Sequence, residues 1–168
     1  MKRYKVLFVC TGNICRSPSA DGILRHKLLE QGLDHLVMTD SVGTHSYHIG
    51  EPPTSTGLRL ALQRGYDYSD LRARQLNSRD FENFDLILAM DHGHLDIIKD
   101  NCPEPHLHKI AMFLDYCDQS NKEVNDPYYG GPSDYEAMLD VIEIGVAGLL
   151  SHLRHQIHGT KSVHQIHE

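Results

Sequence analysis

A cysteine and an arginine near the start of the chain have the spacing of a nucleophile and an anion-binding group. Cys10 ends an apolar run at residues 6–9, and Arg16 follows after five intervening residues. Directly after the arginine come Ser17 and Pro18. A hydroxyl residue followed by proline is typical of the first positions of a helix. This segment therefore predicts a strand, a tight loop and a helix N-terminus.

The predicted loop suits a tetrahedral oxyanion such as phosphate. Backbone N–H groups before a helix point inward, the helix dipole adds positive potential, and the Arg16 guanidinium can bind two phosphate oxygens at once. The same field should stabilise a thiolate on Cys10. A nucleophile and the binding site of its electrophile would then coincide. The predicted phosphate-binding residues are Thr11, Gly12, Asn13, Ile14, Cys15 and Ser17.

Three of these loop residues have a further predicted role. A loop wrapped round a phosphate needs positive φ angles, which Gly12 adopts freely and Asn13 tolerates better than most residues. The Ser17 hydroxyl can cap the helix and also donate toward the Cys10 sulfur. The alternative is a buried core cysteine and a surface arginine, and it leaves the agreement of so many features unexplained.

The loop and several later segments resemble a known enzyme family. Residues 10–18, CTGNICRSP, together with residues 126–129, DPYY, are similar to the low-molecular-weight protein tyrosine phosphatases. The resemblance covers about residues 3–155 and includes DSVGT at 40–44, GEPP at 50–53, RARQ at 72–75 and DLILAMD at 85–91. It implies an enzyme with a Cys10 nucleophile and an Arg16 phosphate clamp, without a metal or an organic cofactor.

Asp126 is the predicted general acid and base. Expelling a tyrosine phenolate is slow without a proton donor, because the conjugate phenol has a pKa of about 10. Residues 125–132 are rich in turn-forming Pro and Gly and could bring an acid over the phosphate. On composition alone a plain Asp-Pro turn explains Asp126 better, and the family resemblance reverses that order. The competing carboxylates are Asp91, Asp115, Asp118 and Asp134, of which the first and last lie at or beside predicted helix starts.

The resemblance also implies how the loop is supported. The family's match to Ser17 supports the leaving thiolate, and its match to Ser41 helps hold Asn13. The family often has a histidine in a third supporting position, which here is Leu71. Cys15 could be a small apolar filler, while the resemblance implies that it traps an oxidised Cys10 as a reversible disulfide.

Three tyrosines are predicted to wall the substrate pocket. Tyr47, Tyr128 and Tyr129 occupy the positions where the family places aromatic rings, which can sandwich a phenyl ring in a pocket too deep for phosphoserine. The alternative is three ordinary surface tyrosines. Related phosphatases that prefer phosphoarginine carry Thr in place of Ile14, and an apolar Ile suits an aromatic ring better. We therefore expect tyrosine-phosphorylated proteins or peptides as substrates.

Alternating strand and helix patterns predict one doubly wound α/β domain with a four-stranded parallel sheet and helices on both faces. The predicted strands lie near residues 5–9, 36–41, 85–89 and 109–114. Sites in such sheets lie at the C-terminal ends of strands, which is where Cys10 falls. The last helix is predicted from a Ser133–Glu136 capping box followed by Tyr135, Leu139, Ile142, Val146, Leu149 and Leu153 at helical spacing.

Composition agrees with a small cytoplasmic enzyme. The chain has 168 residues and a net charge of -7, which argues against a nucleic-acid partner, and no segment approaches the length of a membrane span. The four cysteines are expected to be reduced. We predict a catalytic domain over residues 1–157 and a His-rich, disordered tail over residues 158–168. The thirteen histidines of the chain show no spacing typical of metal ligands. The protein is expected to be a monomer or weak dimer.

Two other chemistries can use such a loop. An arsenate reductase would need a relay of further thiols, but Cys102 and Cys117 are separated by fourteen residues. A phosphoarginine phosphatase on the same scaffold is the second alternative. A binding module without turnover is a third class, and it would be expected to lack the nucleophile or the acid. The presence of Cys10, Arg16 and Asp126 together favours catalysis.

Overall fold

A four-stranded parallel sheet forms the centre of the computed structural model, which describes residues 2–167, with side chains described for residues 2–158. Its strands are β1 (Tyr4–Cys10), β2 (Val37–Gly43), β3 (Leu86–Ala89) and β4 (Ile110–Met112). They lie in the order β2-β1-β3-β4, and all neighbours are parallel. The predicted doubly wound α/β fold is confirmed.

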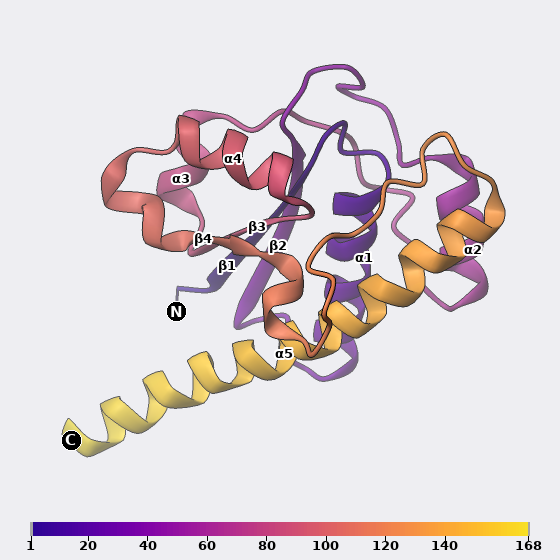
Figure 1. Ribbon diagram of the computed structural model, residues 1–168. Helices are drawn as coiled ribbons and strands as arrows, with labels where there is room; N and C mark the ends of the chain where they lie inside the picture. The colour runs from indigo at the N-terminus through magenta and orange to yellow at the C-terminus, as the bar shows by residue number, and fades with distance from the viewer. Residues whose placement is uncertain (1, 168) are drawn as a thin grey trace.

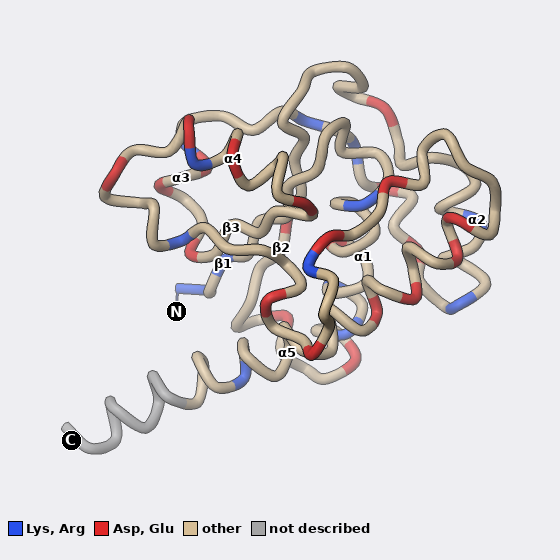
Figure 2. The backbone as a smooth tube through the Cα atoms, in the orientation of Figure 1, with Lys and Arg blue, Asp and Glu red and all other residues tan. Residues whose placement is uncertain are grey.

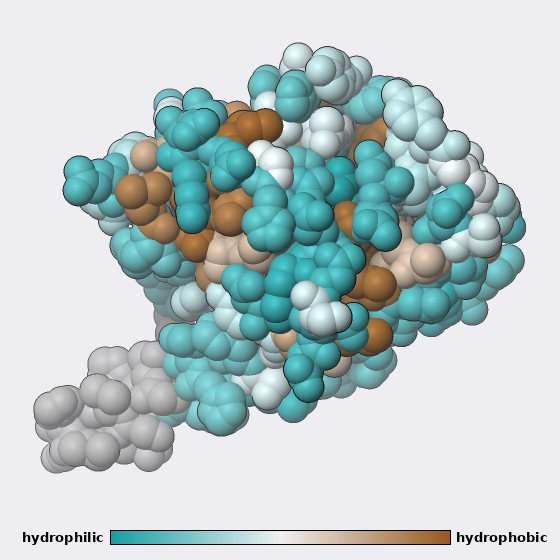
Figure 3. Space-filling model, viewed as in Figure 1, coloured by the Kyte–Doolittle hydropathy of each residue, from teal (hydrophilic) through white to brown (hydrophobic). Residues whose placement is uncertain are grey.

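Helices cover both faces of this sheet (Figure 1). One face is covered by α1 (Arg16–Glu30) and α5 (Pro132–His167), and α2 (Ser55–Gln63) packs against α5 on the same side. The other face packs against α3 (Ser78–Asn83) and α4 (His92–Asn101). Two short 3₁₀ helices flank β4, namely η1 (Glu104–Lys109) and η2 (Phe113–Tyr116). The outer face seen in Figure 3 is mostly hydrophilic, with smaller hydrophobic areas between.

Strand β1 is buried on both sides, which explains its continuous apolar run. Val6 and Phe8 belong to the larger hydrophobic cluster, beneath α1 and α5, and Leu7 and Val9 belong to the smaller one, beneath α3 and α4. All four side chains are fully buried. Successive side chains of a strand point to opposite faces, so a central strand covered on both faces needs apolar residues at every position.

The end of β1 is the point where the chain changes direction within the sheet. From β1 the chain passes to β2 on one side, then returns to β3 on the other side. In open α/β sheets, such a reversal leaves a crevice at the carboxyl ends of the strands, between loops that leave in opposite directions. Cys10 is the last residue of β1, so the fold places it at this crevice.

Some element boundaries differ from the predicted ones. Strand β4 ends at Met112 instead of continuing to residue 114, because the chain turns into η2, where Asp115 Oδ2 accepts the Met112 N–H at 3.2 Å. Helix α5 begins at Pro132, so the predicted Ser133 cap lies inside its first turn. Asp134 Oδ2 instead accepts the N–H of Gly131 at 2.9 Å, just ahead of the helix.

The predicted periodic residues of α5 form an apolar face that belongs to the larger cluster. Its six periodic residues, from Tyr135 to Leu153, are all buried. Two glycines allow close approach on the same helix, since a Cβ at Gly145 would lie 2.5 Å from the Phe113 ring and one at Gly148 would lie 2.2 Å from the Tyr116 carbonyl oxygen. The backbone of α5 continues as a helix to His167, through most of the stretch predicted to be a disordered tail (residues 158–168), and the side chains of residues 159–168 lie outside the described part.

Candidate active site

Cys10 and Arg16 lie at the two ends of a short buried loop, which we call the 10–17 loop (residues 10–17). Cys10 ends β1 and is 3% exposed, and Arg16 opens α1 and is 4% exposed. The helix thus begins one residue before Ser17. The prediction that Ser17 is its N-cap is wrong. The Ser17 hydroxyl lies 2.9 Å from the Cys10 sulfur, the other contact predicted for it, and 3.3 Å from the Val42 carbonyl oxygen. A hydroxyl free of the capping role can donate to a thiolate.

Asn13 braces this loop internally and ties it to two other parts of the protein. Its Nδ2 donates to Ser17 Oγ at 2.8 Å and to Ser41 Oγ at 2.9 Å, while its Oδ1 accepts the Arg74 N–H at 3.0 Å. Asn13 is buried and has a φ of 60°, as predicted for one position of the loop. Leu71 packs against the larger hydrophobic cluster. The third support of the loop is therefore a backbone N–H, that of Arg74.

Gly12 does not have the positive φ predicted for it. Its role is a close approach, because a Cβ there would lie 2.8 Å from the His48 ring. Gly43 does the same from the end of β2, where a Cβ would lie 2.7 Å from the Thr11 carbonyl oxygen. At Gly43 the short contact is with backbone and leaves no room for a side chain, whereas at Gly12 the His48 ring would have to move aside. The loop is thus packed closely against the end of β2.

The Arg16 guanidinium is anchored through one of its terminal nitrogens. Nη1 donates to Asp91 Oδ2 at 2.8 Å and to the Val124 carbonyl oxygen at 3.0 Å. Burial raises the pKa of Asp91, but the His94 N–H and Arg16 more than offset this, so its pKa lies below the usual value. Asp91 is then an ionised anchor. Figure 2 shows acidic positions on helices and loops throughout the chain, so this cationic site lies within a largely acidic protein.

Asp126 faces the same guanidinium from the segment between η2 and α5, which we call the 117–131 loop (residues 117–131). Its Oδ2 lies 3.6 Å from Arg16 Nη2, its Oδ1 accepts the Tyr128 N–H at 3.1 Å, and its side chain is 46% exposed. Among the competing carboxylates, Asp91 anchors Arg16, Asp115 caps η2, and Asp134 accepts the Gly131 N–H. The geometry favours Asp126, which lines the pocket beside Cys10.

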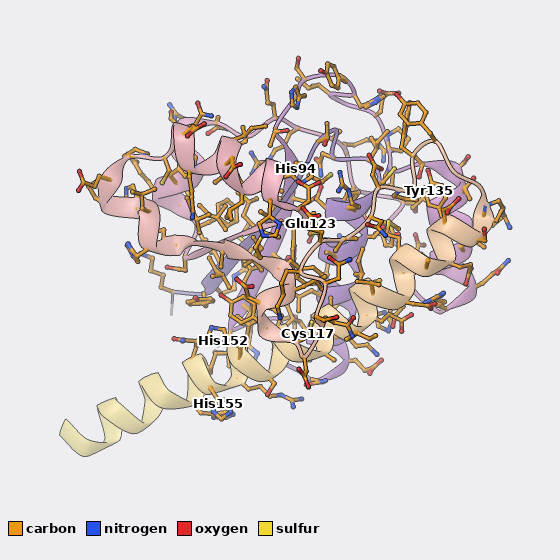
Figure 4. The ribbon with its side chains drawn as sticks, viewed as in Figure 1. His94, Cys117, Glu123, Tyr135, His152 and His155 are labelled. Carbon is orange, nitrogen blue, oxygen red and sulfur yellow. The ribbon has the colours of Figure 1, made fainter. Side chains whose placement is uncertain are left out.

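Two contacts with the start of α4 anchor the 117–131 loop just before Asp126. The Val124 N–H donates to the Met90 carbonyl oxygen at 2.8 Å. Glu123 Oε2 accepts the His92 N–H at 2.9 Å and lies 3.1 Å from His92 Nδ1. Figure 4 labels Glu123, which comes from this loop, and His94, which comes from the first turn of α4. These contacts place the general-acid candidate next to the arginine.

A pocket of about 160 Å³ opens above Cys10 and Arg16. The three predicted tyrosines line it together with Ile14 and His48. Tyr47 stacks on His45 with ring centroids 5.0 Å apart, and Tyr128 packs edge-on against Tyr129 at 4.8 Å. Tyr129 is 96% exposed, so its ring stands at the rim. The structure brings every predicted pocket residue to the same opening.

Cys15 is buried beside the pocket and is the N-cap residue of α1. Its sulfur lies 3.6 Å from Tyr135 Oη and 3.8 Å from Thr54 Oγ1. Burial raises the pKa of the Cys15 thiol to about 11. Cys15 is therefore a neutral thiol at pH 7. Cys102 and Cys117 lie in other parts of the fold, after α4 and after η2, and are partly exposed.

Two histidines at the site were missed by the sequence reasoning. His48 lines the pocket, and its Nδ1 lies 2.6 Å from Glu51 Oε2. His94 is buried against Thr11 and Arg16. A signal for His94 did exist, because it falls three residues after Asp91, the N-cap of α4, where a first-turn side chain faces the cap.

In the described residues no group of three or more His, Cys, Asp or Glu could hold a metal ion, and none of the described helices could cross a membrane.

Comparisons with known proteins agree with this geometry. Residues 5–159 match the family model described as low molecular weight phosphotyrosine protein phosphatase. A low molecular weight protein-tyrosine-phosphatase of Streptomyces coelicolor is 38% identical over 160 residues, which is 93% of this chain and 97% of that protein. The corresponding human phosphatase is 38% identical over 135 residues, or 79% of this chain and 85% of that protein. The crystal structure of a protein tyrosine phosphatase from Entamoeba histolytica aligns with a TM-score of 0.87 and 37% identity, covering 91% of this chain and 98% of that one.

Proposed function

Because the chain belongs to the low molecular weight phosphotyrosine protein phosphatase family, we propose that it hydrolyses phosphotyrosine through a cysteinyl-phosphate intermediate. One observation carries the proposal: Cys10, Arg16 and Asp126 line a single pocket, with the carboxylate 3.6 Å from the guanidinium. A nucleophile, an oxyanion clamp and a proton donor are the three groups that this reaction needs.

In the first step the Cys10 thiolate attacks phosphorus. An S–P bond forms as the bond to the tyrosine oxygen breaks, and Asp126 gives its proton to that oxygen so that a neutral phenol leaves. Ser17, 2.9 Å from the sulfur, donates to the thiolate before attack and again when the thiolate is released. This contact lowers the cost of holding negative charge in a buried position.

In the second step water hydrolyses the cysteinyl phosphate. Asp126, now ionised, removes a proton from the water as its oxygen attacks phosphorus. The S–P bond breaks, phosphate forms, and the Cys10 thiolate is regenerated. An exposed carboxyl suits both steps. Water can reach it in the second step, and the proton that it removes from this water is the one that it donates in the next cycle.

Arg16 and the loop backbone stabilise the transferring phosphoryl group in both steps. The group is planar and carries negative charge on its equatorial oxygens, which a guanidinium can bind in a bidentate manner. Because Nη1 is already bonded to Asp91 and Val124, the guanidinium is held in place before substrate arrives. Donors that need no reorganisation contribute most to transition-state stabilisation.

The pocket walls support phosphotyrosine as the substrate. Tyr47 and Tyr128 can contact a phenyl ring, and Ile14 adds an apolar side chain to the lining. The substrates are accordingly tyrosine-phosphorylated proteins or peptides, acted on by a cytoplasmic monomer or weak dimer without a cofactor. Cys15 is the proposed redox partner of Cys10, forming a disulfide when mild peroxide has converted the Cys10 thiolate to a sulfenic acid.

The proposal is tested by measuring turnover of phosphotyrosine, phosphoserine and phosphoarginine peptides side by side, together with arsenate reduction in the presence of thiols. We expect phosphotyrosine to be preferred by at least about 10²-fold, because phosphoserine is too short for the pocket and the apolar Ile14 and the tyrosine rings suit a phenyl ring better than a guanidinium. Faster turnover of phosphoarginine would show that phosphoarginine, not phosphotyrosine, is the substrate class. Arsenate reduction without phosphatase activity would show that the reaction is arsenate reduction.

A further inference from the structure

The first turn of α4 lies against both terminal nitrogens of Arg16. Asp91, the N-cap of α4, binds Nη1, and His94 has its Nε2 at 3.4 Å from Nη2. The same Nε2 lies 2.8 Å from Oγ1 of Thr11, the residue after the nucleophile. His94 is 4% exposed, and Figure 4 shows it at the start of α4. The contacts of its Nε2 are thus made with the 10–17 loop, while its Nδ1 lies 3.2 Å from Asp91 Oδ1.

These contacts indicate which nitrogen of His94 carries the proton. A guanidinium only donates, so the Nε2 atom that faces it must be an acceptor, and the neutral ring then has its proton on Nδ1. Thr11 links the two groups, since its hydroxyl accepts from Arg16 Nη2 at 3.5 Å and donates to His94 Nε2. Burial, and next to it Arg16, lower the pKa of His94 to about 4. A neutral ring at pH 7 is consistent with these contacts.

The bonds of Arg16 also show which edge is available for phosphate. Both protons of Nη1 are directed at acceptors, Asp91 Oδ2 and the Val124 carbonyl oxygen. Two phosphate oxygens must therefore be bound through Nε and Nη2. Nη2 has two protons, and His94 with Thr11 lies on one side of it. When one Nη2 proton points to these acceptors, the other points into the pocket.

We propose that His94 is a positioning residue, which orients the Nη2 side of Arg16, directly and through Thr11, for bidentate binding of the phosphoryl group. This inference rests on the proposed function. A neutral acceptor suits the task, because a further carboxylate in addition to Asp91 and Asp126 would also fix the guanidinium but would offset the positive charge that attracts phosphate. An imidazole with a bare Nε2 supplies the acceptor without adding negative charge.

A purely structural role for His94 is the competing explanation, since a buried histidine with a hydroxyl partner can simply fill a core position. The two explanations differ in their consequences for phosphate binding. A space-filling residue affects the stability of the fold, whereas a positioning residue affects the affinity of the site for a tetrahedral oxyanion. Binding of inorganic phosphate, measured by calorimetry, reports on the second property and requires no turnover.

The test compares His94→Leu with His94→Gln, whose Oε1 can take the place of Nε2 as a neutral acceptor. We expect the Leu variant to raise the phosphate dissociation constant about tenfold and to lower kcat/KM on a phosphotyrosine peptide by a similar factor. The Gln variant should stay within about threefold of the original protein in both measurements. His152→Gln is the matched control, because His152 packs on the Tyr116 ring of η2, and both quantities should be unchanged.

Thermal unfolding of each variant completes the experiment. A folded Leu variant that keeps phosphate affinity and kcat/KM within twofold would overturn the proposal, as would a folded Gln variant as impaired as Leu. If the Leu variant does not fold, Thr11→Val removes only the linking hydroxyl and should weaken phosphate binding about threefold, and an unchanged constant there also contradicts the proposal. A protein that binds phosphate in this pattern but does not hydrolyse phosphotyrosine would refute the proposed function and leave the role of His94 intact.

Discussion

The 10–17 loop and the 117–131 loop supply groups to the same pocket, yet the protein holds them in opposite ways. In the first loop Asn13, Arg16 and Ser17 are almost completely buried, and Asn13 alone makes three side-chain hydrogen bonds. In the second loop the Asp126 side chain is 46% exposed and Tyr129 is 96% exposed. One loop is packed into the domain, and the other meets solvent.

This difference matches the two kinds of chemistry. Stabilising a transferring phosphoryl group requires donors that are fixed before the reaction, because dipoles that must reorient lose most of their effect. Moving protons requires a carboxyl that can meet a leaving oxygen in one step and a water in the next. A buried, anchored loop suits the first task, and an exposed loop anchored at Val124 suits the second. Perturbing each loop should therefore have distinct consequences.

The largest effect is expected for Cys10→Ser, at the centre of the buried loop. An alcohol of similar shape does not ionise at neutral pH, so turnover of phosphotyrosine should become undetectable. Phosphate binding, measured by calorimetry, should persist, since the loop, Arg16 and their hydrogen bonds remain. Measurable turnover in this variant would remove Cys10 from the role of nucleophile.

Arg16→Lys should be nearly as damaging. A lysine ammonium is a point charge and cannot replace the planar fork that binds two oxygens, so kcat/KM should fall roughly 10³-fold. It also cannot bind both Asp91 and phosphate in the same geometry. Steady-state kinetics and phosphate affinity measure the loss, and near-normal values for Lys would show that Arg16 is not the clamp.

In the exposed loop, Asp126→Asn should slow turnover of phosphotyrosine roughly 10²-fold or more, with a smaller loss on activated nitrophenyl phosphates. An acidic phenol leaves without help from a proton donor, so the effect must depend on the leaving group. Asp118→Asn, in the same loop, is the matched control and should leave kcat unchanged. An equal loss on both substrates, with the first step rate-limiting, would move the acid's role to another carboxylate.

Asn13→Ala and Asn125→Ala compare the same change in the two loops. The first leaves Ser41 and the Arg74 N–H without their partner and puts alanine at a φ of 60°. We expect it to lower the unfolding temperature by several degrees and kcat/KM about tenfold. Asn125 is exposed, so its replacement should leave the unfolding temperature unchanged. Equal shifts in unfolding temperature would mean that the two loops do not differ in how firmly they are held.

The contrast between the loops also explains how far the sequence could predict the site. The strand, the reactive cysteine and the arginine follow from local residue types and spacing, because a parallel strand, a phosphate-binding loop and a helix form one continuous segment. Asp126 could be assigned only through a family resemblance, because its position beside Arg16 depends on contacts with α4 that are distant in sequence.

Two sequence-based predictions about the 10–17 loop were wrong for the same reason, namely that they depend on contacts with other parts of the fold. Ser17 was predicted both to cap the helix and to donate toward Cys10; the cap was wrong, because the helix begins at Arg16, and the contact with Asn13 was not foreseen. Gly12 was predicted to need a positive φ, whereas its φ is not positive and it lies close to the His48 ring. Tertiary contacts of this kind leave no signal in local composition.

The smallest effect is expected at the anchor of the exposed loop, for Glu123→Gln. The amide can still accept the His92 N–H, but the ionic part of the contact is lost. Because the pair is largely exposed, we expect kcat on phosphotyrosine to fall only about two- to threefold. KM and phosphate affinity should not change, since the buried loop is untouched. Steady-state kinetics on phosphotyrosine and on a nitrophenyl phosphate would measure this fall in kcat. The kcat on the nitrophenyl phosphate should not change.

The pH dependence of this small effect separates an anchoring role from a general surface-charge effect. The hydrogen bonds from the His92 backbone and side chain hold the pKa of Glu123 below its usual value of 4.5. A carboxyl with a depressed pKa stabilises the folded loop above that usual value and loses its contribution as pH falls through the lowered pKa. The difference between Glu123→Gln and the original protein should therefore be full at pH 6 and vanish in strong acid, where both side chains are neutral. Glu104→Gln, an exposed change in η1, should show no difference at either pH, and an equal effect there would mean that net charge, not the anchor of Asp126, sets the rate.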